Sequence, residues 1–301
     1  MLLIDGITFR YRGSQSDVLQ GVSFEVGPGQ AVGVLGPNGA GKTTFLGALV
    51  NSLDGRRGGR VLVNGRADFA AHEIGIASQG VALYPTLTVA ENIEHAARLT
   101  LGRKEAKSAL ADALEEYHLT KLAGVPCREL SGGQQRLVHI ATSFVHKPLI
   151  RLLDEPTTSL DFQTRLRLIA LIASWRAQGT ALLVTSHYPE DIEDLCTDLV
   201  LLHGGRARVM KPLATFVSVG AKLIKYSTQS NGREEEYVIK FNGGTLSDFI
   251  AALSGVSAEH VGESLTGLEL ASGTLRQMLL RDPELRSHLG EEAPSAKDYQ
   301  P

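Results

Sequence analysis

GPNGAGKT, residues 36–43, lies between an apolar run that ends in glycine, AVGVLG (31–36), and an apolar segment with helical spacing, FLGALVNSL (45–53). The octapeptide fits the pattern G-x-x-x-x-G-K-[ST], in which glycines let backbone N–H groups converge on phosphate oxygens. The helix that follows adds positive partial charge at its N-terminus. We therefore expect a phosphate loop here, with Lys42 on the β- and γ-phosphates of a nucleotide and Thr43 on a Mg²⁺ ion.

The composition sets limits on the class of protein. A chain of 301 residues has room for about two domains, each of roughly 150 residues. With 43% hydrophobic and 21% charged residues, it is neither disordered nor collagen-like. No window approaches the ~18 consecutive apolar residues of a membrane helix, and the N-terminus lacks the pattern of a signal peptide, so we expect a cytoplasmic protein. A net charge of -3 offers no broad basic surface for nucleic acid.

The two cysteines do not form a recognisable site. Cys127 and Cys196 are far apart in the sequence and lie outside any C-x-x-C pattern. We expect both to be reduced, structural thiols.

The periodicity indicates an α/β fold. The segments LLIDGITFR (2–10), VSFEV (22–26) and RVLVNG (60–65) read as strands. A helical insertion follows over about residues 86–146, and the Thr88–Glu91 pair forms a capping box in it. LIRLLDE (149–155) and TALLVTSH (180–187) then read as buried strands with a helix between them, which predicts a parallel sheet. We assign residues 1–215 to this main domain.

Residues 216–290 have the pattern of a small α+β accessory domain. KLIKYST (222–228) and EYVIKFN (236–242) alternate as strands do, whereas TLSDFIAAL (245–253) and TLRQMLLR (274–281) have helical spacing. The polar residues 291–301 are expected to be a disordered tail.

Asp154 and Glu155 close the apolar strand LIRLLDE. Alone, two acids after a strand are more often solvated loop residues. Downstream of a phosphate loop, however, an Asp in this place is a common ligand of nucleotide-bound Mg²⁺, and the next carboxylate can deprotonate an attacking water. We therefore expect Asp154 to bind Mg²⁺ and Glu155 to act as general base.

LSGGQQR, residues 130–136, resembles the signature of ATP-binding cassette (ABC) ATPases. Ser131 and Gln134 also form a capping box, so that a second helix N-terminus in the chain is suited to an anion. The resemblance implies that two subunits pair head to tail. Each ATP then lies between the phosphate loop of one subunit and residues 131–134 of the other.

The same resemblance assigns further roles, each by position. Tyr11 matches the aromatic residue that stacks on adenine, although a tyrosine at a strand edge is the plain alternative. Gln79 matches the glutamine that contacts Mg²⁺ and the attacking water. Ser159-Leu160-Asp161 matches a loop that reaches across the dimer, and His187 matches the histidine on the γ-phosphate.

The resulting set falls into three groups. Expected catalytic residues are Lys42, Gln79, Glu155 and His187, and expected Mg²⁺ ligands are Thr43, Gln79 and Asp154. Expected ATP-binding residues are Tyr11, Gly36, Pro37, Asn38, Gly39, Ala40, Gly41, Lys42, Thr43, Thr44, Ser131, Gly132, Gly133, Gln134 and Asp161.

The resemblance covers residues 2–215 and is closest to the stand-alone ATPase subunits of bacterial exporters, on the segments LYPTLTVAENI (83–93) and SHYPEDIEDLC (186–196). It implies an α/β phosphate-loop NTPase fold of the ABC type, with a mixed sheet core, an antiparallel β subdomain and the helical insertion. It also implies an ATPase that drives a separate transmembrane permease at the inner face of the plasma membrane. A surface near Gln79 and the helical insertion is the expected docking site.

Three alternatives stay open on the sequence. The chain could be a soluble ABC ATPase acting on nucleic acid or ribosomes, although those proteins usually have two cassettes, long coiled coils or zinc-binding cysteines. It could be the ATPase of an importer. A cassette that binds ATP without hydrolysis is disfavoured by the presence of both Glu155 and His187.

Arg151 departs from the apolar pattern of its strand. Because an unpaired buried cation is costly, we expect it to find a carboxylate or to reach the edge of the strand.

Overall fold

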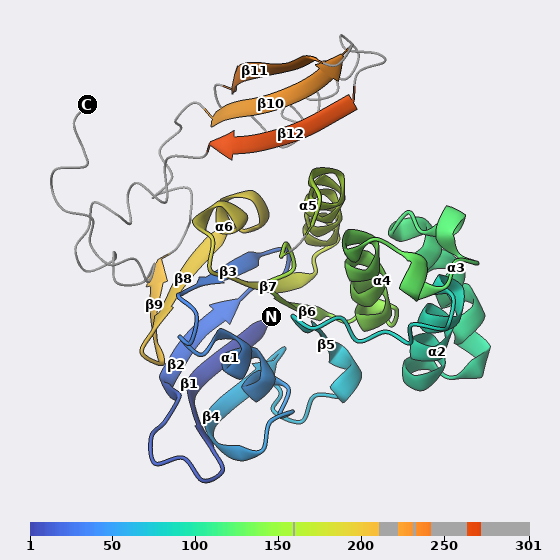
Figure 1. The fold of residues 1–301 in the computed structure, drawn as a ribbon. Coiled ribbons are helices and arrows are strands. Elements are labelled where there is room, and N and C mark those ends of the chain that lie inside the picture. The colour runs from blue at the N-terminus through green and yellow to red at the C-terminus, as the bar shows by residue number, and fades with distance from the viewer. Residues whose placement is uncertain (159, 211–221, 231–232, 242–263, 272–301) are drawn as a thin grey trace, which may run out of the picture. The chain divides into compact units, whose positions relative to one another are not determined.

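The computed structural model describes residues 1–158, 160–210, 222–230, 233–241 and 264–271. They belong to two compact units, one within residues 1–210 and one formed by residues 222–271. Figure 1 shows the elements of each unit.

A three-stranded antiparallel sheet opens the first unit, in the order β2-β1-β4. Its strands are β1 (Leu2–Tyr11), β2 (Leu19–Val26) and β4 (Gly55–Val63). Burial alternates along β1, as expected for a strand with one face in the core. The predicted start of β4 at residue 60 was too late, because β4 pairs with β1 as far as Tyr11, opposite Gly55.

The second sheet of this unit has the order β5-β6-β7-β3-β8-β9. All neighbours are parallel except β9, which runs antiparallel to β8. The predicted parallel α/β sheet is therefore confirmed. Its strands are β3 (Ala31–Leu35), β5 (Ile74–Ala77), β6 (Ile150–Asp154), β7 (Ala181–Ser186), β8 (Asp198–His203) and β9 (Arg206–Met210).

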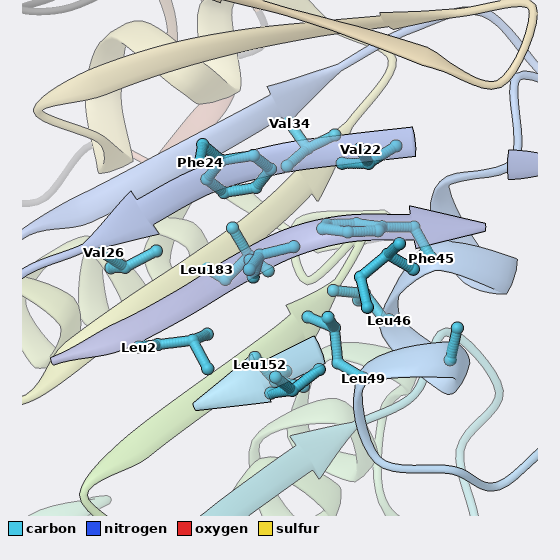
Figure 2. Close-up of a cluster of buried hydrophobic side chains, with 14 of the residues drawn as sticks. Leu2, Val22, Phe24, Val26, Val34, Phe45, Leu46, Leu49, Leu152 and Leu183 are labelled. Atoms are coloured by element: carbon cyan, nitrogen blue, oxygen red, sulfur yellow. The ribbon is translucent and has the colours of Figure 1, made fainter. Parts of the chain in front are cut away.

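Helix α1 (Lys42–Leu49) joins the two sheets through one apolar core. Figure 2 shows Phe45, Leu46 and Leu49 of this helix among buried side chains from both sheets. The apolar segment over 45–53 was expected to be helical, and α1 includes residues 45–49 of it. The helix begins at Lys42, directly after the phosphate loop, and it ends before Asn51, whose left-handed backbone (φ 54°) turns the chain.

The helical insertion contains α2 (Val89–Leu101), α3 (Arg103–Glu116) and α4 (Gly132–Phe144). The capping box of α2 is confirmed, since the Glu91 N–H donates to Thr88 Oγ1 and the Thr88 N–H donates to Glu91 Oε2. Figure 1 shows α2 and α3 side by side, with α4 next to them. Short 3₁₀ helices within the described residues are Thr120–Leu122 and Cys127–Glu129 in this insertion and Ala71–Glu73 before it.

Two more helices complete the described part of this unit, α5 (Phe162–Ala177) and α6 (Pro189–Leu195). Across all the described residues, no helix combines the length and the apolar character that crossing a membrane requires.

Arg151 lies in the middle of this packing and is only 3% exposed. Its guanidinium carbon is 4.2 Å from the centre of the Trp175 ring, and its Nη1 is 3.6 Å from Glu116 Oε1. The expected carboxylate partner is thus Glu116, while the contact with Trp175 was not foreseen. Cys127 and Cys196 are free and buried, in agreement with structural thiols.

The second unit contains the sheet β11-β10-β12, with β10 (Lys222–Ser230) antiparallel to β11 (Arg233–Phe241) and to β12 (Ser264–Ala271). The two predicted strands are present. The predicted helices over 245–253 and 274–281 and the predicted tail lie outside the described residues.

Candidate functional site

The phosphate loop connects β3 to α1 in a conformation that requires its glycines. Gly39 and Gly41 have left-handed backbones (φ 81° and 99°), which residues with a Cβ rarely adopt. A Cβ on Gly36 would collide with the carbonyl oxygen of Leu202. The loop can therefore present backbone N–H groups to an anion at the start of α1.

Lys42 folds back over this loop and is buried. Its ammonium group donates to the carbonyl oxygens of Gly36 (2.8 Å) and Pro37 (3.2 Å). It also lies 3.3 Å from Glu155 Oε1. Lys42 thus links the phosphate loop to the end of β6.

The carboxylate of Glu155 brings the four predicted catalytic residues together. Besides the contact with Lys42, Oε1 lies 3.2 Å from His187 Nδ1. The other oxygen, Oε2, accepts a hydrogen bond of 3.2 Å from Gln79 Nε2. These side chains come from α1, from the loop after β5, from the end of β6 and from the loop after β7, all at the carboxyl edge of the parallel sheet.

Glu155 also has an unusual backbone. Its φ of 45° is in the left-handed region, where a residue with a side chain is uncommon. The backbone N–H of Glu155 donates to Thr185 Oγ1 (3.1 Å), and the Thr185 hydroxyl donates to Asp154 Oδ1 (2.6 Å). Sequence reasoning missed Thr185, and the signal was available only after β6 and β7 had been paired in register, with Asp154 opposite Thr185.

Tyr11 lies beside the first turn of α1. Its hydroxyl is 3.0 Å from Thr44 Oγ1, and the residue is 40% exposed. Phe9 meets the ring edge to face at 5.0 Å between centroids. The tyrosine is therefore held next to the phosphate loop while part of its surface faces solvent.

Residues 131–134 form the predicted capping box at the start of α4. The Gln134 N–H donates to Ser131 Oγ, and the Ser131 N–H donates to Gln134 Oε1. Gly133 packs closely on Asp161, since a Cβ on Gly133 would lie 2.8 Å from Asp161 Oδ2. In the part of the chain that the structure describes, no hydrogen bond or ion pair joins residues 131–134 to the phosphate loop. The helix N-termini suited to anions, at the start of α1 and at the start of α4, thus form separate sites in one chain.

Asp161 caps helix α5 rather than standing free. Its carboxylate accepts hydrogen bonds from the backbone N–H (2.9 Å) and the hydroxyl (2.7 Å) of Thr164. These bonds lower the pKa of Asp161, so the carboxylate is charged at neutral pH. Ser159, which precedes it in the predicted loop, lies outside the described residues.

The donor set suits a hard cation. Thr43 offers a hydroxyl and Asp154 a buried carboxylate, and these oxygens are the ligands that Mg²⁺ prefers. Gln79 contacts Glu155 through its NH₂ group, which leaves its carbonyl oxygen for a cation. The residues present therefore fit a phosphate-bound Mg²⁺ ion.

Comparison with protein families and curated proteins gives a consistent result. The profile of the ABC transporter family matches residues 19–158. The linearmycin resistance ATP-binding protein LnrL of Bacillus subtilis (strain 168) is 34% identical over 211 residues, which are 68% of this chain and 67% of that protein. The Nod factor export ATP-binding protein I of Ralstonia nicotianae is 36% identical over 68% of this chain and 65% of its own length. The match thus spans about two thirds of each relative.

Solved structures agree on the fold. An ATP-binding subunit of an ABC transporter is 26% identical and aligns with a TM-score of 0.63 over 72% of this chain and 91% of its own. A dimeric ATP-binding cassette in a post-hydrolysis state, bound to ADP and phosphate, is 25% identical, with a TM-score of 0.62 over 71% of this chain and 99% of its own.

Proposed function

This chain belongs to the ABC transporter family, and we propose that it is the ATP-hydrolysing subunit of an ABC exporter. The observation that carries the proposal is the convergence of Lys42, Gln79 and His187 on the carboxylate of Glu155. A phosphate-binding cation, a polar amide and an imidazole thus surround one carboxylate at hydrogen-bond distance. This is the arrangement that positions a water for attack on a phosphoryl group.

In the proposed reaction, ATP replaces the contact between Lys42 and Glu155. When ATP binds, its β- and γ-phosphates compete with Glu155 for the ammonium group of Lys42. Glu155 keeps its contacts with Gln79 and His187 and faces the water. As the water oxygen bonds to the γ-phosphorus, its proton passes to Glu155 and the bond from phosphorus to the bridging oxygen of ADP breaks. His187 and Lys42 stabilise the charge on the transferring group.

A magnesium ion belongs to this proposal. Thr43, Asp154 and the carbonyl oxygen of Gln79 would hold it, and when bound it neutralises the charge that develops on the phosphate oxygens. The Thr185 hydroxyl holds Asp154 Oδ1 in place and at the same time receives the N–H of Glu155. Thr185 therefore keeps the metal ligand and the general base at a fixed separation.

The partners are a second ATPase subunit and a transmembrane permease. Ser131, Gly132 and Gln134 of each subunit close over the ATP of the other, with Asp161 at the same interface. The permease places the dimer at the inner face of the plasma membrane. Its contact surface lies near Gln79 and α2, where Tyr84 and Leu99 are exposed. The names of two relatives, which refer to linearmycin resistance and to Nod factor export, support export as the direction.

The test is ATP turnover by the purified chain, compared with its Glu155→Gln variant. We expect turnover to fall at least 100-fold, while the variant still binds ATP and forms ATP-dependent dimers in size-exclusion chromatography. A variant as active as the wild type would contradict the role of Glu155. Co-purification of the tagged chain from detergent-solubilised membranes then tests the permease. Recovery of ribosomes or nucleic acid instead of a polytopic membrane protein would contradict the exporter.

A further inference from the structure

Arg136, in the first half of α4, connects the two loops that carry the proposed catalytic residues. Its side chain is buried, with 4% of the residue exposed. Nη1 donates to the carbonyl oxygens of Ser78 (2.5 Å) and Gln79 (2.9 Å) in the loop after β5. Nη2 donates to those of Asp154 (2.7 Å) and Glu155 (3.3 Å) at the end of β6.

A guanidinium group is suited to this task because its donors form a planar fork with fixed angles. One edge of the fork holds the backbone of Gln79 and the other holds the backbone of Glu155. Arg136 therefore ties both loops to one side chain of α4. A lysine in its place could not satisfy the four carbonyl oxygens at once, because its three donors diverge from one nitrogen.

His139 strengthens the same connection from the next turn of α4. The backbone N–H of Ala82 points at its Nδ1 (3.4 Å), so Nδ1 is the acceptor and the proton is on Nε2. Nε2 lies 3.2 Å from the carbonyl oxygen of Ser78 and donates to it. Arg136 and His139 thus hold the loop over residues 78–82 at two points.

Helix α4 also has a functional start. Its N-cap is Ser131, which in the proposed dimer meets the nucleotide of the other subunit. In the proposed dimer, the N-cap of α4 therefore contacts the partner's ATP. The second and third turns of the same helix contact the loops that carry Gln79 and Glu155 of its own subunit.

We infer that Arg136, assisted by His139, is a positioning residue that couples the two ATP sites of the dimer. It transmits the position of α4, set by the partner's ATP at Ser131, to Gln79 and Glu155 of its own subunit. Arg136 touches no reacting atom. The inference rests on the proposed function for the dimer, and it assigns to Arg136 an effect on its own subunit's site rather than on the site that Ser131 completes.

Mixed dimers test this assignment. One subunit keeps Glu155 and the other carries Glu155→Gln, so each dimer has a single active site. Arg136→Lys is then placed either in the subunit that owns the active Glu155 or in the other one. We expect kcat to fall at least 10-fold in the first case and less than 2-fold in the second, with the KM for ATP changed less than 3-fold in both. An equal loss in both cases, or a larger loss in the second, would overturn the inference.

Two further measurements exclude a general loss of structure. Arg151→Gln removes an equally buried arginine near the opposite end of β6, whose side chain makes no hydrogen bond or ion pair with either loop among the described residues, and it should leave kcat unchanged even if it lowers the melting temperature as much. His139→Ala, a smaller change, should lower kcat about 3-fold when placed in the active subunit. If Arg136→Lys fails to fold and His139→Ala in the active subunit leaves kcat unchanged, the inference is wrong.

Hydrogen–deuterium exchange separates this inference from the proposed function. In the full chain without nucleotide, Arg136→Lys should speed exchange in both residues 78–82 and residues 154–158, whereas Arg151→Gln should not. Absence of ATP turnover in the wild type would contradict the proposed function, and the exchange data would still decide whether Arg136 links the two loops. Faster exchange in neither segment would overturn the link.

Discussion

Strand β6 has a buried cation near each of its ends, and the two are held in different ways. At the carboxyl end, Lys42 contacts two carbonyl oxygens and Glu155, all at 2.8–3.3 Å. At the other end, Arg151 lies over the Trp175 ring, and its nearest carboxylate oxygen is 3.6 Å away. In the part of the chain that is described, neither Nε nor Nη1 of Arg151 has a hydrogen-bond partner.

The different partners of Lys42 and Arg151 show which of the two cations can exchange its partners for a ligand. The partners of Lys42 are oxygens, and the oxygens of a phosphate can replace them at little cost in energy. Arg151 is held by an aromatic face and by exclusion of water, which no small ligand replaces. The same strand therefore has an exchangeable end, where the proposed chemistry takes place, and a fixed end that belongs to the packing.

The largest expected effect is on ATP affinity, which a substitution at Lys42 should change and one at Arg151 should not. Lys42→Met should raise the Kd for ATP about 100-fold or more, roughly 3 kcal/mol, because a charged partner of the phosphates is lost. Arg151→Met should leave the Kd within about 2-fold. Isothermal titration calorimetry of both variants measures this. Similar losses in the two variants would remove the distinction between the two ends.

Substitutions of Arg151, at the fixed end, should lower the free energy of unfolding rather than the affinity for ATP. Arg151→Ala opens a cavity beside Trp175 and leaves Glu116 without its cation, so we expect the free energy of unfolding to fall by about 3 kcal/mol. Arg151→Met should lower it by about 1 kcal/mol or less, since a flexible thioether packs well against an aromatic ring. Urea denaturation compares the two. An equal loss in the two variants would show that the charge, and not the packing, holds this end.

The pH dependence of stability should be dominated by the exchangeable end. Burial, together with the nearby charge of Arg136, lowers the pKa of His139 from 6.5 to about 4. Between pH 6.5 and pH 4 the unfolded chain takes up a proton that the folded chain does not. The free energy of unfolding should therefore fall by up to about 2–3 kcal/mol over this range from His139 alone.

The matched control for this prediction is His146, near the fixed end, whose pKa is also lowered by burial. Unfolding experiments at a series of pH values on His139→Ala and His146→Ala compare the two. The variant His139→Ala should lose more of the pH dependence. If His146→Ala loses more, the titration belongs to the Arg151 end instead.

The smallest expected effect concerns two helix caps of the same kind. Ser131→Ala and Thr88→Ala should each lower the free energy of unfolding by about 1 kcal/mol, because each removes a side-chain acceptor for the N–H three residues ahead. Only Ser131→Ala should also weaken the ATP-dependent dimer, since only Ser131 meets the partner's nucleotide in the proposed function. Analytical ultracentrifugation with ATP separates the two. Equal weakening would place the dimer contact elsewhere.

The parts of this molecule that could be predicted from the sequence are those set by neighbouring residues. The phosphate loop, the capping boxes at Thr88 and Ser131 and the alternation of β1 each depend on a few consecutive positions. The carboxylate partner of Arg151 could be expected because an unpaired buried charge is costly. Which carboxylate it would be could not be predicted, because Glu116 is in α3, whereas Arg151 is in β6.

The rest depends on contacts between distant segments. Arg136 meets carbonyl oxygens that are 18 to 58 residues away in the chain, and these bonds exist only once β5 and β6 lie side by side. Thr185 reaches Asp154 because β7 pairs with β6 in a register that no local pattern sets. The left-handed backbone of Glu155 is likewise imposed by its surroundings, since the sequence Asp-Glu-Pro gives no sign of it.

The left-handed backbone at position 155 sets the requirements of stability against those of the proposed activity. Glycine or asparagine adopts φ near 45° more readily than glutamate does, by about 1 kcal/mol. A population of variants sorted for folding alone should therefore drift away from glutamate at this position, whereas under the proposed function one sorted for ATP turnover should return to it. The same residue would thus give opposite answers to two selections, and the stretch of chain around it is where stability and activity should be hardest to improve together.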